Sequence, residues 1–280
     1  MAGNCPEASQ AFERYIANFP NGSFLLNAQF YKGDCNYRSK EFDKALTSFD
    51  YVISQPKNIY TEQALLGAAR IEMNQNKYQN AVKHYKQLSE SNTSPGNMKE
   101  ATTGMMRGYY QLAEYENALK AADKVLGLDK LTPEVTREAT YIKARSLQEL
   151  GRDVLALEEY KKIAVEVMSR EGAEAKFRVA ELSFKKGDIA TAEKQILEFS
   201  EKTTPHEYWI ARSFILWSDI FKQQKEYFQA IQTLQSIIDY YEKMDDGILD
   251  MARKKKEELV KLQEANEQPV EREDVEINIE

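Results

Sequence analysis

Apolar residues recur along the chain at helical spacing, inside blocks of thirteen residues that resemble one another. In the block at 76–88 they lie on one face of an α-helix, at Tyr78, Ala81, Val82, Tyr85 and Leu88. A second helical stretch precedes each block, for example at 62–74 and 133–150. Each repeating unit is therefore predicted to contain two helices and two short turns.

One alanine marks the same place in every block, and successive alanines are 36 to 38 residues apart: Ala8, Ala45, Ala81, Ala118, Ala156, Ala192 and Ala230. Self-similarity at a nearly constant period of this size indicates a stacked repeat array. The alanine is small because two helices that cross closely leave no room for a larger side chain. A large residue four positions later, such as Phe49 or Tyr85, fills the space one turn along.

This pattern resembles the tetratricopeptide repeat (TPR) family, in which an Ala precedes an aromatic residue by four positions on a period of about 34 residues. The second helices match it at Ala45/Phe49, Ala81/Tyr85 and Ala156/Tyr160, and the small position of the first helices holds Gly33, Ala69, Ala144, Ala180 and Ser218. Met106 departs from that position, and we expect Ala122, which replaces the aromatic residue, to compensate. The resemblance covers residues 8–238. It implies an all-α fold, a right-handed superhelical solenoid of antiparallel helix pairs with a C-terminal capping helix.

The repeat register predicts the domain organisation. We expect a half repeat with only its second helix at 1–22, six helix pairs at 23–244, a capping helix at 245–265 and an acidic tail at 266–280. The incomplete first repeat predicts a fragment of a longer repeat protein or an engineered start. The charged face and narrow apolar stripe of 247–265 are typical of the solvated end of a solenoid. The tail composition predicts disorder in its first part, and Val270–Glu280 is a candidate to occupy a groove of the same or a neighbouring molecule.

Charge and chemistry narrow the functional classes. The net charge of −7 disfavours nucleic-acid binding. The chain contains no run of eighteen apolar residues, so the sequence predicts no membrane span. Cys5 and Cys35 match no zinc spacing and are expected to be free buried thiols, unless adjacent repeats bring them together as a disulfide. His84 and His206 lack the partners of a catalytic triad. We therefore expect no enzyme activity, no cofactor and no metal.

The candidate site is a groove, which the resemblance places on the first helices at the second, fifth, ninth, twelfth and thirteenth positions of each repeat. With the block alanine counted as position twenty, the candidate residues are Phe30, Tyr37, Arg38, Arg70, Met73, Arg107, Tyr110, Tyr141, Arg145 and Phe177. Three consecutive repeats carry Arg at position nine, and the guanidinium fork suits carboxylates. This predicts an acidic, extended peptide as the ligand. The open alternative is that these arginines pair with Glu100, Glu138 and other neighbours.

The leading hypothesis is a non-enzymatic scaffold that binds a protein or peptide. The alternatives are a spacer without a groove ligand and an accessory domain of a longer protein. The opening residues also resemble TPR modules of bacterial cell-envelope proteins, namely the Tol–Pal periplasmic coordinator and the lipoproteins of outer-membrane assembly. The matching residues are Phe12, Tyr15, Phe19, Pro20, Ala28, Tyr31, Gly33 and Phe42. This resemblance implies a periplasmic or envelope location, with the cytoplasm as the alternative. The truncated first repeat would expose an apolar face around Phe12 and Tyr15, which predicts a homodimer.

Overall fold

The computed structural model describes residues 4–91 and 93–267, and these residues form fourteen α-helices and no strand. The helices are α1 (Cys5–Asn18), α2 (Leu25–Arg38), α3 (Phe42–Ser54), α4 (Thr61–Asn74), α5 (Tyr78–Glu90), α6 (Pro95–Gln111), α7 (Tyr115–Leu126), α8 (Pro133–Glu149), α9 (Asp153–Ile163), α10 (Arg170–Lys185), α11 (Ile189–Ser200), α12 (Glu207–Gln223), α13 (Tyr227–Tyr240) and α14 (Ile248–Glu267). The all-α prediction is confirmed.

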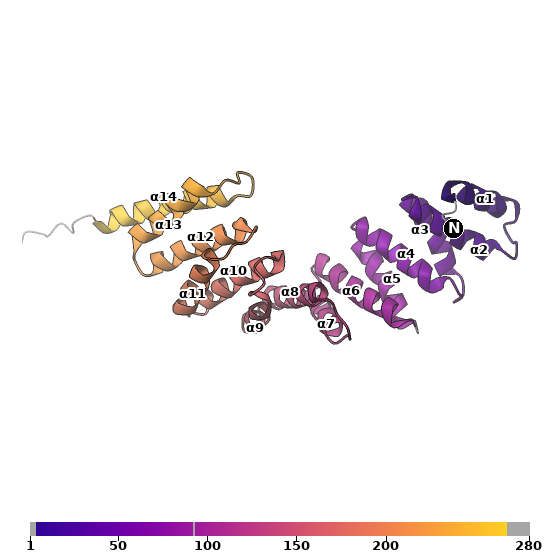
Figure 1. Cartoon of the computed structure of the whole chain (residues 1–280), viewed down its shortest axis with the longest axis horizontal. Helices are drawn as coiled ribbons and strands as arrows, with labels where there is room; N and C mark the ends of the chain where they lie inside the picture. Colours follow the sequence, from indigo (N-terminus) through magenta and orange to yellow (C-terminus); the bar gives the residue numbers. More distant parts are fainter. Residues whose placement is uncertain (1–3, 92, 268–280) are drawn as a thin grey trace, which may run out of the picture. The chain divides into compact units, whose positions relative to one another are not determined.

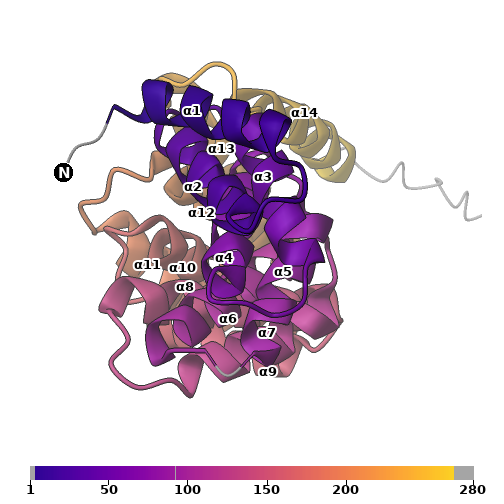
Figure 2. The same ribbon diagram turned by 90° about the vertical axis from the view of Figure 1, so that its right-hand side faces the viewer.

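The chain divides into two compact units, with the boundary after Ala156. In unit 1 each helix from α1 to α8 packs against the next, and α2, α4, α6 and α8 also contact one another in sequence (Figures 1 and 2). In unit 2 the same pattern runs from α10 to α14, with α10, α12 and α14 in successive contact. Each unit is thus a stack of antiparallel helix pairs. The last helix, α14, packs on α12 and α13, where the first helix of a further repeat would lie.

The turn inside each helix pair has one conformation throughout the chain. Position fifteen of each repeat has a positive φ, between 56° and 86°, at Lys40, Asn76, Ala113, Gly151, Gly187 and Lys225. The amide of the following residue donates to the carbonyl five residues back, at 2.8–2.9 Å, as from Glu41 to Asn36 and from Arg152 to Leu147. These bonds are those of the Schellman motif, which ends a helix and reverses the chain. Glycine occupies only two of the six turns and Asn76, which tolerates the left-handed region, a third, so three turns impose that conformation on a Lys or Ala that disfavours it.

Several first helices begin with a side-chain cap. The hydroxyls of Ser94, Thr132 and Ser169 each accept a hydrogen bond from the amide three residues later, at 3.3, 3.4 and 3.0 Å. Proline follows Ser94 and Thr132 at the first helical position, where its missing N–H costs nothing. The predicted Thr132 cap is present, and these caps define where α6, α8 and α10 start.

The core of unit 1 depends on small residues placed under aromatic rings. Phe49, at position twenty-four, lies against Gly33 of its own repeat and Gly67 of the next. A methyl group added at either glycine would approach Phe49 ring carbons to 2.9 and 2.6 Å respectively. Tyr85 lies against Gly104 in the same way. Neighbouring repeats therefore interlock through one ring and the small residue that faces it.

One repeat reverses this arrangement. Ala122 occupies the aromatic position, and the space it leaves is filled from two sides, by Met106 of the same repeat and Ile142 of the next. All three belong to one buried cluster and are at most 4 % exposed. The expected compensation between Met106 and Ala122 is present. Ile142 also contributes to it, at the position where the two preceding repeats have Gly67 and Gly104.

Candidate peptide-binding groove

A groove of about 510 Å³ lies on the first helices of unit 1, and we call it the α4–α6 groove. Its lining comes from α2, α4, α5, α6 and α8 and consists of Tyr37, Arg70, Met73, Asn74, Tyr78, Tyr85, Glu100, Gly104, Arg107, Gln111 and Glu138. The first helices α2, α4, α6 and α8 are in successive contact, and position nine lies beside position two of the next repeat where Arg70 meets Glu100 and Arg107 meets Glu138.

Two ion pairs cross the groove from repeat to repeat. The Nε and Nη2 atoms of Arg70 donate to the two carboxylate oxygens of Glu100, at 2.5 and 2.6 Å. Arg107 makes the same pair of bonds to Glu138, at 2.7 and 2.6 Å. These hydrogen bonds raise the pKa of both arginines above its ordinary value. The side chains are 29–46 % exposed, so water screens the pairs and each contributes about 1 kcal/mol or less.

The sequence left open that these arginines pair with neighbouring glutamates instead of a ligand. The structure shows this pairing for Arg70 and Arg107. Each guanidinium still has capacity, because Nε and Nη2 are the atoms engaged by the glutamate. Within the described residues, no hydrogen bond or ion pair involves Nη1 of Arg70 or of Arg107. Each arginine can thus donate from a second edge while it stays paired.

Tyr85 closes the bottom of the groove. Its ring is 4 % exposed and packs in a cluster with Leu65, Leu88 and Met105. Burial, followed by the nearby Glu100 carboxylate, raises the pKa of the Tyr85 hydroxyl to about 12. The ring fits because Gly104 has no side chain. The groove consequently has an aromatic floor and a charged, self-neutralised wall.

The structure brings four of the ten predicted site residues into this groove: Tyr37, Arg70, Met73 and Arg107. Four others lie on first helices but do not line it. Arg38 pairs with Asp34 at 2.9 Å and Arg145 with Glu149 at 2.8 Å, each within its own helix. Tyr110 meets Tyr115 edge to face, and Tyr141 packs against the cluster that contains Met106.

The remaining two predicted residues are core residues. Phe30 is 8 % exposed and stacks on Tyr60 with ring centroids 4.4 Å apart. Phe177 is 2 % exposed and stacks on Trp209 at 5.5 Å. Position five of both repeats therefore turns toward the neighbouring helices, where these rings stabilise the stack and offer almost no surface to a ligand.

The sequence prediction missed seven lining residues: Asn74, Tyr78, Tyr85, Glu100, Gly104, Gln111 and Glu138. Four of them could have been found from the repeat register, since Glu100 and Glu138 occupy position two and Asn74 and Gln111 occupy position thirteen, both groove-facing positions. Tyr78 and Tyr85 were recognised only as the repeat's aromatic positions. Their second role depends on how close α5 comes to the groove, which the repeat pattern does not specify.

The structure also places the cysteines and His84, which the sequence analysis considered as candidate chemical groups. Cys5 and Cys35 are free and half-buried, and burial with a hydrogen bond to Cys5 raises the pKa of the Cys35 thiol to about 11. His84 Nδ1 lies 2.7 Å from a carboxylate oxygen of the buried Glu72, so His84 is held in a half-buried polar pair.

The apolar face predicted at the first repeat is partly covered, because Phe12 stacks on Tyr31 with ring centroids 6.2 Å apart. The homodimer stays a prediction. The boundaries proposed for the repeats also stay predictions, and Val270–Glu280 lies outside the described residues.

Within residues 4–91 and 93–267, no group of three or more His, Cys, Asp and Glu side chains is arranged to hold a metal ion. Over the same residues, no helix is long and apolar enough to cross a membrane.

Comparison with known proteins identifies the repeats. A family model described as tetratricopeptide repeat matches residues 2–59, and another with the same description matches 63–92 and 208–243. A search of curated proteins finds no match.

Solved structures are similar in fold. YrrB, described as a TPR protein with an unusual peptide-binding site, is 14 % identical over 68 % of this chain and 91 % of its own, with a TM-score of 0.51. A tetratricopeptide repeat protein from Parabacteroides merdae is 18 % identical over 90 % of this chain and 92 % of its own, with a TM-score of 0.46. MamA is 16 % identical over 80 % and 99 %, with a TM-score of 0.49. At these identities, the likeness concerns the fold.

Proposed function

Because the chain is a tetratricopeptide repeat protein, whose fold suggests a protein–protein interaction scaffold, we propose that its α4–α6 groove binds an extended segment of a partner protein. The observation that carries the proposal is the groove lining. Aromatic and thioether surface from Tyr37, Met73 and Tyr78 adjoins hydrogen-bonding groups that retain capacity. YrrB, which has a similar fold, is described as having a peptide-binding site, and this supports a peptide as the ligand class.

The chemistry of the wall suits an extended backbone. Nη1 of Arg70 and of Arg107 can donate to peptide carbonyls, while the exposed side-chain amides of Asn74 and Gln111 can both donate and accept. An extended segment presents such groups on both sides. Tyr and Met surfaces would cover its apolar side chains.

The predicted acidic character of the ligand takes a narrower form. Glu100 and Glu138 already neutralise the two arginines, so a strongly acidic segment would be repelled by them. A single carboxylate placed at the Nη1 edges of Arg70 or Arg107 would avoid most of this repulsion. We therefore propose a segment with one acidic residue among apolar ones.

The test is site-specific photo-crosslinking. p-Benzoylphenylalanine at Tyr78, inside the groove, should capture a partner segment that mass spectrometry identifies, whereas the same group at Phe228, which is 62 % exposed in unit 2, should not capture it. The segment is then synthesised and its affinity measured by calorimetry. Equal capture at both positions, or none at Tyr78, would refute groove binding and favour the spacer alternative.

A pair of charge-swap variants makes the test specific. Arg107→Glu with Glu138→Arg keeps the ion pair and the net charge but moves the guanidinium, and should weaken binding of the synthetic segment about tenfold, or about 1.4 kcal/mol. The matched control swaps Arg152 and Glu116, an exposed pair in unit 1 outside the groove, and should leave affinity unchanged.

We also propose a periplasmic location, for which the support is the resemblance of the opening residues to envelope TPR modules. Fractionation of the source cells with an antibody against this chain tests it. Recovery in the cytoplasmic fraction would refute the location without affecting the groove proposal.

A further inference from the structure

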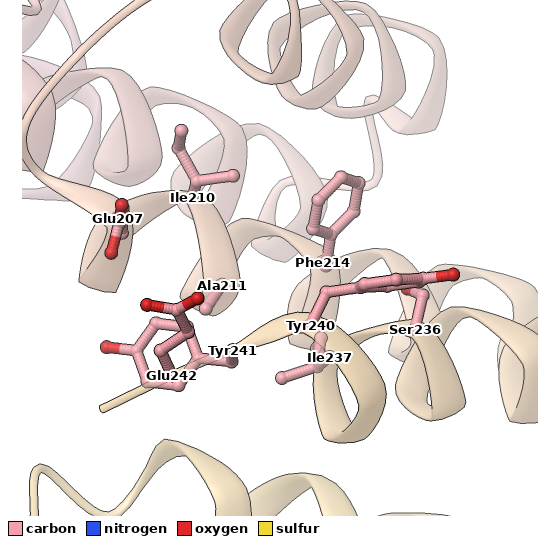
Figure 3. A pocket seen from close by; sticks show the side chains of 9 residues that line it. All are labelled: Glu207, Ile210, Ala211, Phe214, Ser236, Ile237, Tyr240, Tyr241 and Glu242. Carbon is pink, nitrogen blue, oxygen red and sulfur yellow. The ribbon is translucent and has the colours of Figure 1, made fainter. Parts of the chain in front are cut away.

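A second concave surface lies in unit 2, between the N-terminal half of α12 and the C-terminal end of α13, and we call it the α12–α13 crevice. It encloses about 550 Å³ and is lined by Glu207, Ile210, Ala211, Phe214, Ser236, Ile237, Tyr240, Tyr241 and Glu242 (Figure 3). None of these residues belongs to the α4–α6 groove. The proposed function therefore leaves this surface without a role.

The inner lining of the crevice is apolar. Ile210 and Phe214 project from α12 one turn apart, and Ile237 lies on α13. The Tyr240 side chain, near the end of α13, is 83 % exposed beside this lining (Figure 3). An aromatic ring left in water next to an open apolar surface is typical of a place where another molecule packs.

The rim of the crevice is acidic. Glu207 and Glu242 are exposed at its edge. Within the described residues, Glu242 has no ion-pair partner, and the Glu207 carboxylate meets only Lys243, at 3.9 Å with both side chains more than half exposed. Asp246 accepts a hydrogen bond from the hydroxyl of Tyr241. Burial, that bond and the charges of Asp246 and Glu207 raise the pKa of Tyr241 well above its ordinary value, consistent with a negative local field.

We propose that the α12–α13 crevice is a second docking site, which takes a segment of a partner protein in which an aliphatic or aromatic anchor residue is flanked by lysine or arginine. The anchor enters between Phe214 and Tyr240, and the flanking cations meet Glu207 and Glu242. Charge complementarity selects this occupant, because an acidic segment would place like charges beside the rim. This site is separate from the α4–α6 groove. It selects a basic segment, whereas the groove is proposed to bind a segment with one acidic residue.

The crevice carries its own spectroscopic reporter. The ring of Phe214 stacks on Trp217, with centroids 6.0 Å apart and planes 9° apart. The chain has two tryptophans, and both lie on α12. A ligand without tryptophan that packs on Phe214 should therefore change the intrinsic fluorescence.

The experiment titrates the whole chain with the probe peptide acetyl-Lys-Leu-Phe-Lys-Leu-Lys-amide and, separately, with its counterpart in which each Lys is Glu. The basic peptide should give a saturable fluorescence change and the acidic one none. Glu207→Lys with Glu242→Lys should weaken binding of the basic peptide by about tenfold, since two attractions become repulsions. Tyr240→Ala, which removes an exposed ring outside the core, should weaken it while the helix content by circular dichroism stays the same.

A matched control separates the local field from the net charge. Glu226→Lys with Glu258→Lys makes the same change of four charge units, two for each substitution, at the exposed N-cap residue of α13 and an exposed position of α14, neither of which lines the groove or the crevice. This control, and the Arg107/Glu138 swap in the groove, should bind the basic peptide as the wild type does. The proposal is overturned if the basic peptide gives no saturable change, if the acidic peptide binds as tightly, or if both Glu→Lys pairs weaken binding equally.

Discussion

Replacing Gly104 by Ala adds one methyl group where two repeats interlock. Gly104 lies in the middle of α6, with the ring of Tyr85 from α5 against it. The added carbon would lie 2.5 Å from Cζ and 2.6 Å from Cδ2 of that ring, and closer still to Cε2. These separations are about 1 Å shorter than the 3.5–4.0 Å at which carbon atoms pack best.

Two effects of opposite sign determine the outcome. Alanine is favoured over glycine inside a helix by about 1 kcal/mol. Against this, the Tyr85 ring, 4 % exposed among Leu65, Leu88 and Met105, would have to move within a filled cluster. Forcing an extra methyl group into a packed core costs about 1–3 kcal/mol, and here the overlap involves three rigid ring atoms, so the upper part of that range applies. We expect Gly104→Ala to destabilise the chain by about 1–2 kcal/mol.

The assay is urea unfolding followed by circular dichroism at 222 nm, with two matched controls. Gly96→Ala lies in the same helix, where an added methyl group would meet only Ser94 Oγ, at 3.9 Å, and it should be neutral or stabilising. In a Tyr85→Leu background the clashing ring atoms are absent, so Gly104→Ala should cost nothing there. The reasoning fails if Gly104→Ala stabilises as Gly96→Ala does, or if its cost persists in the Leu background.

Three further predictions follow from the turns and the groove. Ala113 has a φ of +56°, which glycine adopts without strain, so Ala113→Gly should raise the free energy of unfolding by about 0.5–1 kcal/mol. Gly151 has a φ of +72°, so Gly151→Ala should lower the free energy of unfolding. Thermal unfolding that shows the reverse order would contradict the turn geometry. Glu138→Gln should lower the free energy of unfolding by less than about 1 kcal/mol, because its partner Arg107 is half-exposed. The difference from the wild type should shrink in 1 M NaCl, which screens exposed charges. A larger, salt-independent loss would show that the ion pair is stronger than its exposure suggests. The pKa of Tyr85 is raised to about 12, so the unfolded state loses this proton first, and stability that is intact below about pH 10 should be lost as the pH rises toward 12. Tyr85→Phe should show a shallower loss of unfolding free energy over that interval, and identical alkaline profiles for the two proteins would refute the assignment.

Much of the fold could be predicted from the sequence, because the repeat is defined by local patterns. The alanine period, the apolar faces and the Thr132 cap each depend on residues within one or two helical turns of one another, and they predicted helix pairs that the structure confirms. The pairing of Met106 with Ala122 was also visible, since both lie in one repeat.

Contacts between repeats were decided only by the tertiary structure. Whether Arg107 meets Glu138, or Ile142 fills the space beside Ala122, depends on how one helix pair stacks on the next, across at least 20 residues of chain. The same stacking turns Phe30 into the core although its position number suggested the groove. Hydrophobic periodicity specifies the face of a helix within an arc that spans both the core edge and the groove, and the packing angle of the neighbouring helix determines which side is buried.

The α12–α13 crevice is the clearest case of this division. Tyr240 and Glu242 carry no motif, and Phe214 reads as an ordinary apolar helix position. Their convergence requires the antiparallel arrangement that brings the start of α12 beside the end of α13. The sequence by itself determined the repeat, its length and its helices. The tertiary structure decided which side chains are paired, buried or left open, because those properties arise from contacts between helices that the local pattern does not encode.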